Sequence, residues 1–370
     1  MESSRCILST ALAVLVAALG CDSTFEPSPR ANAAYLVNLS EAPGLAAVDS
    51  SYDLLGNFGS FGNVREPITE DEARRTLVFV GAGDGPAELV VFDTRTLMVQ
   101  QRTPTATLDS RSPIRGVALY GRRSLFVLPD GRLVLDGALN GESGLVRTQL
   151  DYTPDLFAGP FILQPFDAFL LRDPLRLFVL ARRSEGAIDW VFQIDPGTLA
   201  GTDSVAAAGV VDIAGSPDNR HIYLRTESQI RRFDTQSWTV TAVVESPTAN
   251  VRAKLHVSRS GTTLYLTDPG NLFELPPANA IHRWTSDLTP LPPLELDEFR
   301  SPGDDNPPRI SDLETSAAGD TLFLVVGTGS RGPLYGPQPA RLLVLDESLH
   351  ALLHEIDLEG WSPGVMVQIK

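Results

Sequence analysis

Four arginines stand in the same position relative to the strand-like segments that follow them. Each precedes the second strand of a recurring unit by about twelve residues; they are Arg65, Arg115, Arg252 and Arg309. A guanidinium offers N–H donors in a planar fork, a geometry that binds a carboxylate or a phosphate. Converging around one opening, these groups would form a ligand-binding site for a small anion. The alternative is that they pair with acids of neighbouring units, such as Asp151, Glu245 or Asp312.

Two histidines, His350 and His354, have a spacing that on a helix would let them share a metal ion. They follow a strand and a Glu-Ser turn, so we predict an outer strand here, with the two rings roughly 13 Å apart. The other histidines have no second ligand at metal spacing; they are His221, His256 and His282. We therefore predict no metal and no cofactor. The chain also lacks the Walker loop, the dinucleotide fingerprint and the Gly-x-Ser-x-Gly elbow.

Carboxylates cluster at Glu70-Asp71-Glu72 and at Asp304-Asp305. Paired acids support general acid–base catalysis only when a pocket holds them about 5–9 Å apart. Both clusters are predicted to lie on exposed connections, where they would be solvated. We therefore consider an enzyme less well supported than a binding protein.

The stretch from Ser216 to Val244 shows which elements position these groups. Ser216-Pro217-Asp218-Asn219 consists of residues that favour a turn. β-branched or aromatic residues then alternate through three predicted strands, at 221–225, 230–233 and 238–244. Another apolar strand, Val210 to Ala214, directly precedes them. This pattern predicts one four-stranded antiparallel unit.

The same pattern recurs along the chain with a spacing of about fifty residues between second strands, which is typical of propeller blades. The other strand pairs span residues 75–80 and 89–94, 123–127 and 131–136, 175–180 and 190–196, 263–267 and 271–275, and 320–326 and 341–346. An aspartate is predicted to end the third strand in most units: Asp93, Asp136, Asp195, Asp234 and Asp346. Such units bury their faces by stacking, and radial stacking closes the array.

The two ends of the chain complete the count. Six units cover residues 65–358, which leaves 34–61 at one end and a single strand-like segment, Gly364 to Ile369, at the other. We predict that this last strand pairs with the N-terminal strands. The fold class is thus all-β: a β-propeller of seven four-stranded blades, without exposed ring edges. The arginines would then lie at the start of the innermost strands, around one mouth of the channel.

The Ser216–Val244 stretch resembles the bacterial YVTN or lactonase-like seven-bladed propeller repeat. The likeness lies in its Ser-Pro-Asp-Asn turn, its Ile-Tyr-Leu strand and its Phe-Asp-Thr strand end. The resemblance covers one unit well and the others loosely. It implies the fold, and as an alternative function it implies a lactonase-like hydrolase acting on lactones or anionic sugars.

Two long connections, Leu291 to Arg309 and Thr328 to Ala340, are predicted to emerge on the same face as the arginines. Long loops on a rigid scaffold often carry binding sites. We therefore predict a protein or a small anionic ligand as the partner of this loop-rich face. With 46 acidic and 30 basic residues the chain has a formal net charge of −16, which argues against nucleic acid.

The N-terminal segment predicts export. Arg5 is followed by an apolar run that is too short to span a bilayer, and Ala18-Leu19-Gly20-Cys21 resembles the lipobox of bacterial lipoproteins. We expect residues 1–20 to be a signal peptide, Cys21 to carry lipid, 21–33 to be a membrane tether and 34–370 to be the propeller. The alternative is ordinary secretion. The predicted function is that of a cell-envelope lipoprotein, exported and membrane-anchored, acting as a binding module.

Overall fold

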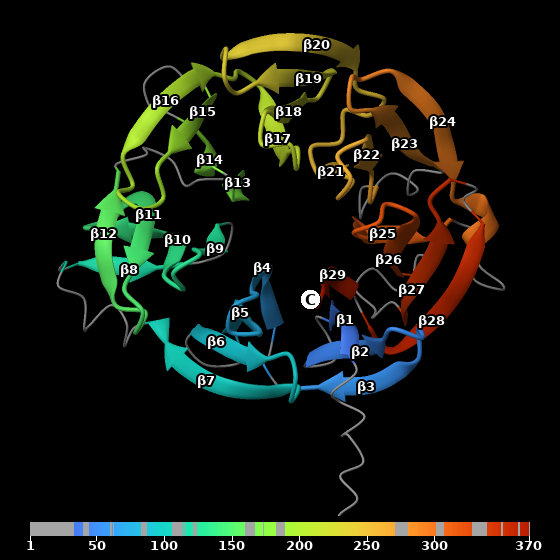
Figure 1. Ribbon diagram of the computed structural model, residues 1–370, viewed down its shortest axis with the longest axis horizontal. Coiled ribbons are helices and arrows are strands. Elements are labelled where there is room, and N and C mark those ends of the chain that lie inside the picture. The colour runs from blue at the N-terminus through green and yellow to red at the C-terminus, as the bar shows by residue number, and fades with distance from the viewer. Residues whose placement is uncertain are drawn as a thin grey trace, which may run out of the picture.

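The chain forms a closed ring of seven antiparallel sheets arranged around a central opening (Figure 1). The computed structural model describes residues 33–39, 44–59, 61, 63–82, 87–105, 114, 116–120, 124–159, 167–172, 174–182, 189–270, 280–300, 307–327, 339–348, 351–361 and 363–369. Apart from the short 3-10 helix η2 (Asp297–Phe299), the named elements are strands. The predicted all-β propeller with seven blades is therefore confirmed.

The innermost strands surround the opening. They are β4 (Asn63–Asp71), β8 (Val117–Leu119) with β9 (Leu125–Val127), β13 (Asp167–Arg172), β17 (Val210–Gly215), β21 (Lys254–Val257), β25 (Arg309–Thr315) and β29 (Pro363–Gln368). The second strands are β5 (Thr76–Ala82), β10 (Leu133–Leu139), β14 (Leu175–Arg182), β18 (His221–Thr226), β22 (Thr263–Thr267), β26 (Thr321–Gly327) and β1 (Ala33–Leu39). Each blade is named below by its innermost strand.

The third strands are β6 (Glu88–Asp93), β11 (Glu142–Thr148), β15 (Asp189–Ile194), β19 (Gln229–Asp234), β23 (Ala280–Thr285), β27 (Pro339–Asp346) and β2 (Gly44–Asp49). The outer strands are β7 (Met98–Pro104), β12 (Pro154–Ala158), β16 (Gly201–Ala206), β20 (Thr239–Glu245), β24 (Pro290–Glu295), β28 (Leu352–Trp361) and β3 (Leu54–Phe58). The β17 blade matches the prediction within two residues at each strand end, because its turn residues mark every boundary.

The ring closes through its own ends, as predicted. β29 pairs antiparallel with β1, with Tyr35 opposite Gln368 and Val37 opposite Met366. Beyond the ladder, Ile369 N–H donates to the Ala34 carbonyl at 2.8 Å. The β29 blade therefore takes its innermost strand from the C-terminal end and its other three strands from the N-terminal end.

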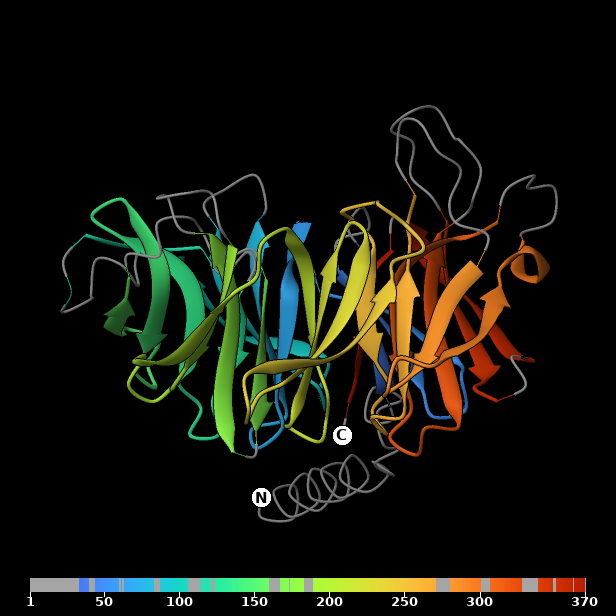
Figure 2. The same ribbon diagram turned by 90° about the horizontal axis from the view of Figure 1, so that it is seen from above.

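The strand directions give the ring two different faces. We call the turn face the one where an innermost strand turns into the second strand and a third strand turns into the outer one. We call the loop face the opposite one, where second strands connect to third strands and each blade connects to the next. The described chain begins at Ala33 and ends beyond Gln368, and both residues lie on the turn face, at the lower side of Figure 2.

The core consists of apolar layers between neighbouring blades. One layer joins the β29 and β25 blades through Val37, Val48, Phe323 and Val344. Another joins the β17 and β21 blades through Tyr223, Ile230, Leu264 and Trp284. Each blade thus covers its neighbour, and the ring is rigid because no sheet has a free face.

Two strand assignments made from the sequence are wrong. Leu125 to Val127 is part of the innermost strand of its blade, which is split into β8 and β9, and is not the second strand. Asp136 consequently lies inside β10, a second strand, where its buried carboxylate accepts the Ser124 N–H at 3.0 Å. In the β21 blade the third strand is Ala280–Thr285, and the predicted 271–275 lies outside the described residues.

The other aspartates end or directly follow third strands, as predicted. Asp93 accepts the backbone N–H groups of Arg95 and Thr96 at 2.8 and 2.9 Å, and Asp234 accepts those of Gln236 and Ser237. Burial opposes the ionisation of Asp93, but the hydrogen bond from the Arg95 guanidinium and these backbone hydrogen bonds outweigh it and lower the pKa of Asp93 to about 2. Asp195 and Asp346 accept a turn N–H in the same way.

Candidate functional site at the loop-face mouth of the channel

Three of the four predicted arginines belong to stretches that begin innermost strands, on the loop face. Arg309 is the first residue of β25, and Arg252 lies in the turn just before β21. Arg65 lies near the start of β4, although its side chain is not among those described, and Arg115 lies outside the described residues. The structure thus places Arg252 and Arg309 at the same end of two neighbouring blades.

A rigid turn presents Arg252. The Ala253 N–H closes this turn on the Asn250 carbonyl at 3.1 Å, and the Asn250 Oδ1 accepts the Arg252 N–H at 3.0 Å. The Asn250 amide is fixed in turn by Asp268, at 2.6 Å. The Arg252 side chain is exposed and has no hydrogen bond or ion pair with any described residue, so Glu245 is not its partner.

Behind this turn lies Arg225, which the sequence analysis did not single out. It is 0% exposed, and its Nη2 donates to the carbonyls of Ala253 at 2.7 Å and Val251 at 3.3 Å. Its Nε and Nη1 have no hydrogen-bond partner in the described part of the chain. Burial lowers its pKa, while the negative charges of Asp212 and Asp268 act in the opposite direction. Arg225 therefore both anchors the turn and adds positive charge beneath it.

Lys254, the first residue of β21, adds a cation next to Arg252. Its side chain is 54% exposed, and its Nζ lies 3.3 Å from Asp212 of the neighbouring β17. The other oxygen of Asp212 accepts the Leu255 N–H at 2.5 Å. Asp312 likewise accepts the Met366 N–H at 2.8 Å from the next blade. These two buried acids thus join the innermost strands of neighbouring blades.

His256 is the third residue of β21, two residues after Lys254. Its Nε2 is 3.0 Å from the Thr267 Oγ1, and its Nδ1 is 3.9 Å from Asp312. Burial lowers the pKa of His256 to about 4, against the pull of Asp212, so the ring is neutral at pH 7. It serves the packing of the channel wall and contributes no charge to the mouth.

The remaining sequence candidates do not join this site. His354 lies on the outer strand β28, as predicted, with its ring 4.5 Å from that of Tyr52. His350, Asp304-Asp305 and Cys21 lie outside the described residues. In the part of the chain that the structure describes, no group of three or more histidine, cysteine or acidic side chains could hold a metal ion.

The acidic cluster at 70–72 is only partly as expected. Glu72 is exposed, but Asp71 is 6% exposed at the end of β4, where it accepts the Arg74 N–H at 3.2 Å. It lies on the turn face and not at the loop-face mouth. Burial arises because the turn after β4 packs against the neighbouring blade, which a local pattern does not reveal.

In chemical terms the loop-face mouth is a cationic entrance on an acidic protein. Arg252 and Lys254 supply exposed donors, and Arg309 lies at the start of the adjacent innermost strand. The backbone and buried side chains fix their positions, so the entropic cost of ordering these residues on binding is small. The arrangement suits recognition of a carboxylate or phosphate.

Comparisons with known proteins agree with the fold. No family model and no curated protein matches the sequence. The structure is similar to the periplasmic gluconolactonase PpgL of Pseudomonas aeruginosa, with a TM-score of 0.60, 14% identity, and 91% of this chain and 99% of that chain covered. It is also similar to the dihydro-heme d1 dehydrogenase NirN, with a TM-score of 0.59, 14% identity, and 96% and 78% of the two chains covered.

A further similar structure is the hydrazine synthase of Kuenenia stuttgartiensis, with a TM-score of 0.53, 14% identity, and 78% of this chain and 85% of that chain covered. These proteins have different activities, so the likeness shows the fold alone. The resemblance to lactonase-like seven-bladed propellers is confirmed at that level. Within the described residues, no helix is long and apolar enough to cross a membrane.

Proposed function

We propose that this chain is an exported, membrane-tethered propeller that binds a small anionic ligand at the loop-face mouth of its channel. The observation that carries the proposal is the exposed pair Arg252 and Lys254, set over the buried guanidinium of Arg225. Arg252 has no ion-pair partner among the described residues, which is uncommon on a chain with a net charge of −16, where acids outnumber bases. An anionic group on the ligand would supply the missing counter-charge.

The positions of the chain ends support a tethered arrangement. The propeller begins at Ala33 on the turn face, so a lipid on Cys21 would hold that face toward the membrane. A tether over residues 22–32 would have a reach of roughly 20 Å if it is flexible. The loop face would then point away from the bilayer, accessible to a solute or to a protein that carries the anionic group. Similarity to a periplasmic protein is consistent with export.

The alternative function is a hydrolase that acts on lactones or anionic sugars. Its support is the likeness in fold to the gluconolactonase, a protein whose sequence is 14% identical. The loop-face mouth itself favours binding over catalysis, because its candidate acid–base groups are already engaged. The neutral His256 is hydrogen-bonded to Thr267, and Asp212 accepts the Leu255 N–H. Both functions predict affinity for anions, and only the alternative predicts turnover.

A ligand screen tests the proposal. A form of the protein that begins at Asp22 is melted in the presence of carboxylates, sugar phosphates and lactones, and co-purified species are identified by native mass spectrometry. We expect at least one small anion to raise the melting temperature and to be recovered unchanged. If NMR detects a hydroxy acid released from a lactone, the protein is the hydrolase of the alternative function and not only a binding protein. A screen without any anion-dependent stabilisation would contradict both.

A further inference from the structure

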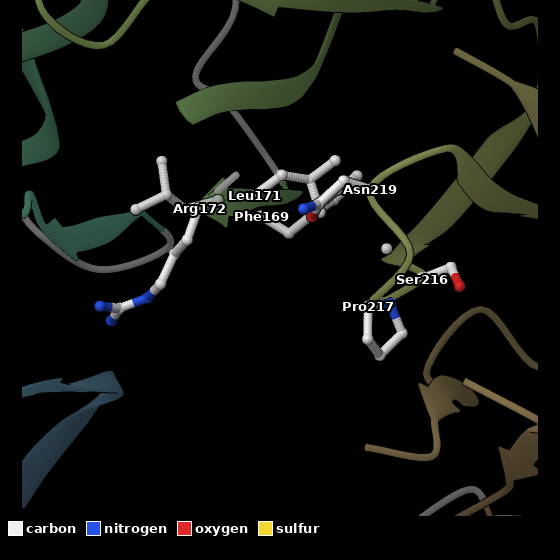
Figure 3. Close-up of a pocket in the computed structure, with 8 residues that line it drawn as sticks. Phe169, Leu171, Arg172, Ser216, Pro217 and Asn219 are labelled. Carbon is white, nitrogen blue, oxygen red and sulfur yellow. The ribbon is translucent and has the colours of Figure 1, made fainter. Parts of the chain in front are cut away.

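The opposite mouth of the channel, on the turn face, contains two neighbouring pockets that share one residue, Arg172. The first has a volume of about 380 Å³ and lies between the ends of β13 and β17 (Figure 3). The second, of about 400 Å³, lies between residues 70–73 at the end of β4 and residues 127–129 at the end of β9. Arg172 lines both, so its side chain stands at the boundary between them.

The guanidinium of Arg172 is available for a ligand. Arg172 is the exposed last residue of β13, and it has no hydrogen bond or ion pair with any described residue. Other arginines of this fold are engaged; Arg147, for example, forms an ion pair with Asp155 at 2.7 Å. In Figure 3 the Arg172 side chain extends away from Phe169 and from Pro217, so its donors are not used on the pocket wall.

The first pocket has a preformed apolar wall. The Phe169 ring stacks on Phe178, with centroids 5.1 Å apart and an interplanar angle of 9°. Gly215 makes this position possible, because a Cβ there would come within 2.4 Å of the Phe169 ring. Pro217 and the buried Leu171 complete the apolar surface. The wall therefore keeps its shape without a ligand, which lowers the entropic cost of binding.

The second pocket has the opposite polarity. Glu70, Asp71 and Glu72 line it together with Arg172, whereas Phe169 belongs to the first pocket. These acids disfavour an anionic group beyond the guanidinium. A ligand must therefore present its negative charge at Arg172 and its apolar part toward Phe169.

We propose that the turn-face mouth is a second binding site, for a small organic carboxylate with an aromatic or aliphatic body. The carboxylate binds the guanidinium of Arg172, and the apolar body lies between Phe169 and Pro217. A charge-assisted hydrogen bond together with apolar burial gives a usable affinity for a small ligand. The site is independent of the anion site proposed for the loop face, and it lies on the face where the folded chain begins and ends.

Titration calorimetry with phenylacetate, acetate and phenethylamine on the protein and its variants tests this site. We expect phenylacetate to bind, acetate to bind at least tenfold more weakly, and phenethylamine not to bind because its charge is of the wrong sign. Arg172→Gln should weaken phenylacetate binding at least tenfold, and Arg172→Lys should weaken it less. Arg102→Gln, which removes the same charge on the outer strand β7, is the matched control and should bind like the wild type.

Several results would overturn the site. One is equal affinity of the wild type and Arg172→Gln for phenylacetate; another is no binding of phenylacetate at millimolar concentration. A third is loss of phenylacetate binding in Arg252→Gln with Lys254→Gln but not in Arg172→Gln, which would assign the binding to the loop face. Unchanged melting temperatures of the variants show that the fold is intact. If Arg252→Gln with Lys254→Gln leaves every anion-dependent melting shift unchanged, the function proposed for the loop face fails, and the result expected here stays the same.

Discussion

At the scale of single residues, the polar groups around the channel divide into those that hold the ring together and those that remain accessible. Asp212 and Asp312 belong to the first kind, because each accepts an N–H from the innermost strand of the next blade. Arg252 and Arg172 belong to the second kind, one at each mouth of the channel. Sequence reasoning identified Arg252 from its register. It missed Arg225, whose burial and partners depend on the neighbouring blade, and Arg172, whose pockets form only where the ends of several innermost strands meet.

His256 provides a prediction at this scale. Its pKa is lowered in the folded state to about 4, so between that value and the ordinary 6.5 the unfolded chain binds more protons. The stabilising contribution is present above pH 6.5 and is lost as the pH falls toward 4. We expect the free energy of unfolding in urea to fall between pH 7 and pH 5, with about 2 kcal/mol of that loss due to His256.

The control for this prediction is His256→Gln, which keeps a hydrogen-bonding group near Thr267 and does not titrate. Its free energy of unfolding should vary less over the same pH range. The charged groups near the His256 imidazole are the same in the variant; they are Asp212, Lys254 and Asp312. Equal pH dependence of the two proteins would show that His256 is not the group responsible.

At the scale of elements, the aspartates that end the third strands act as turn locks, and Asp93 is the best defined. Its carboxylate accepts two backbone N–H groups and lies 3.1 Å from the Arg95 guanidinium. Since its folded pKa of about 2 is below the ordinary 3.8, it stabilises the fold above pH 4 and loses this effect as the pH falls to 2. Asp93→Asn should cost about 2 kcal/mol at pH 7 by chemical denaturation. The cost should shrink toward zero near pH 2, and a pH-independent difference would contradict this origin.

Most of the element order was predictable, for a local reason. The β17 blade has Pro, Asp, Asn and Ser in its turns, and apolar and polar residues alternate along its strands. Each strand boundary can therefore be predicted from the sequence. The β8–β9 pair is different. The innermost position of this blade is formed by two segments, which resemble two separate strands in the sequence, and this moved the expected positions in that blade by one strand. Only the pairing of both segments with β10 identifies them as one position in the blade.

Ring closure gives a second prediction at this scale. Removal of residues 363–370 would leave the edge of β1 unpaired and would take away the Met366 N–H that Asp312 accepts. Exposed strand edges promote association between chains. We expect the truncated protein to aggregate and to melt at a lower temperature than the full chain, by light scattering and circular dichroism. Equal solubility and an unchanged melting temperature would rule out a closing role for β29.

At the scale of the whole molecule, the two faces of the ring would have different surroundings if the chain is lipid-anchored through Cys21. The acidic body has little affinity for an anionic bilayer, so the acyl chains would provide the attachment. Cys21→Ala should therefore move the protein from the membrane fraction to the soluble fraction, as followed by fractionation and immunoblotting. A variant that still sediments with membranes, together with a wild type that carries no lipid by mass spectrometry, would refute the anchor.

The central claim is that the loop-face mouth binds an anion through Arg252 and Lys254, and a thermal-shift titration of the double variant tests it most directly. The anion that stabilises the wild type should add about 2.7 kcal/mol at roughly a hundredfold excess over its Kd. Arg252→Gln combined with Lys254→Gln should abolish this gain and leave the melting temperature of the ligand-free protein nearly unchanged, whereas Arg102→Gln should keep the gain. If instead the double variant keeps the full anion-dependent gain, or melts lower without ligand while the wild type shows no gain, these side chains serve the fold and not a ligand.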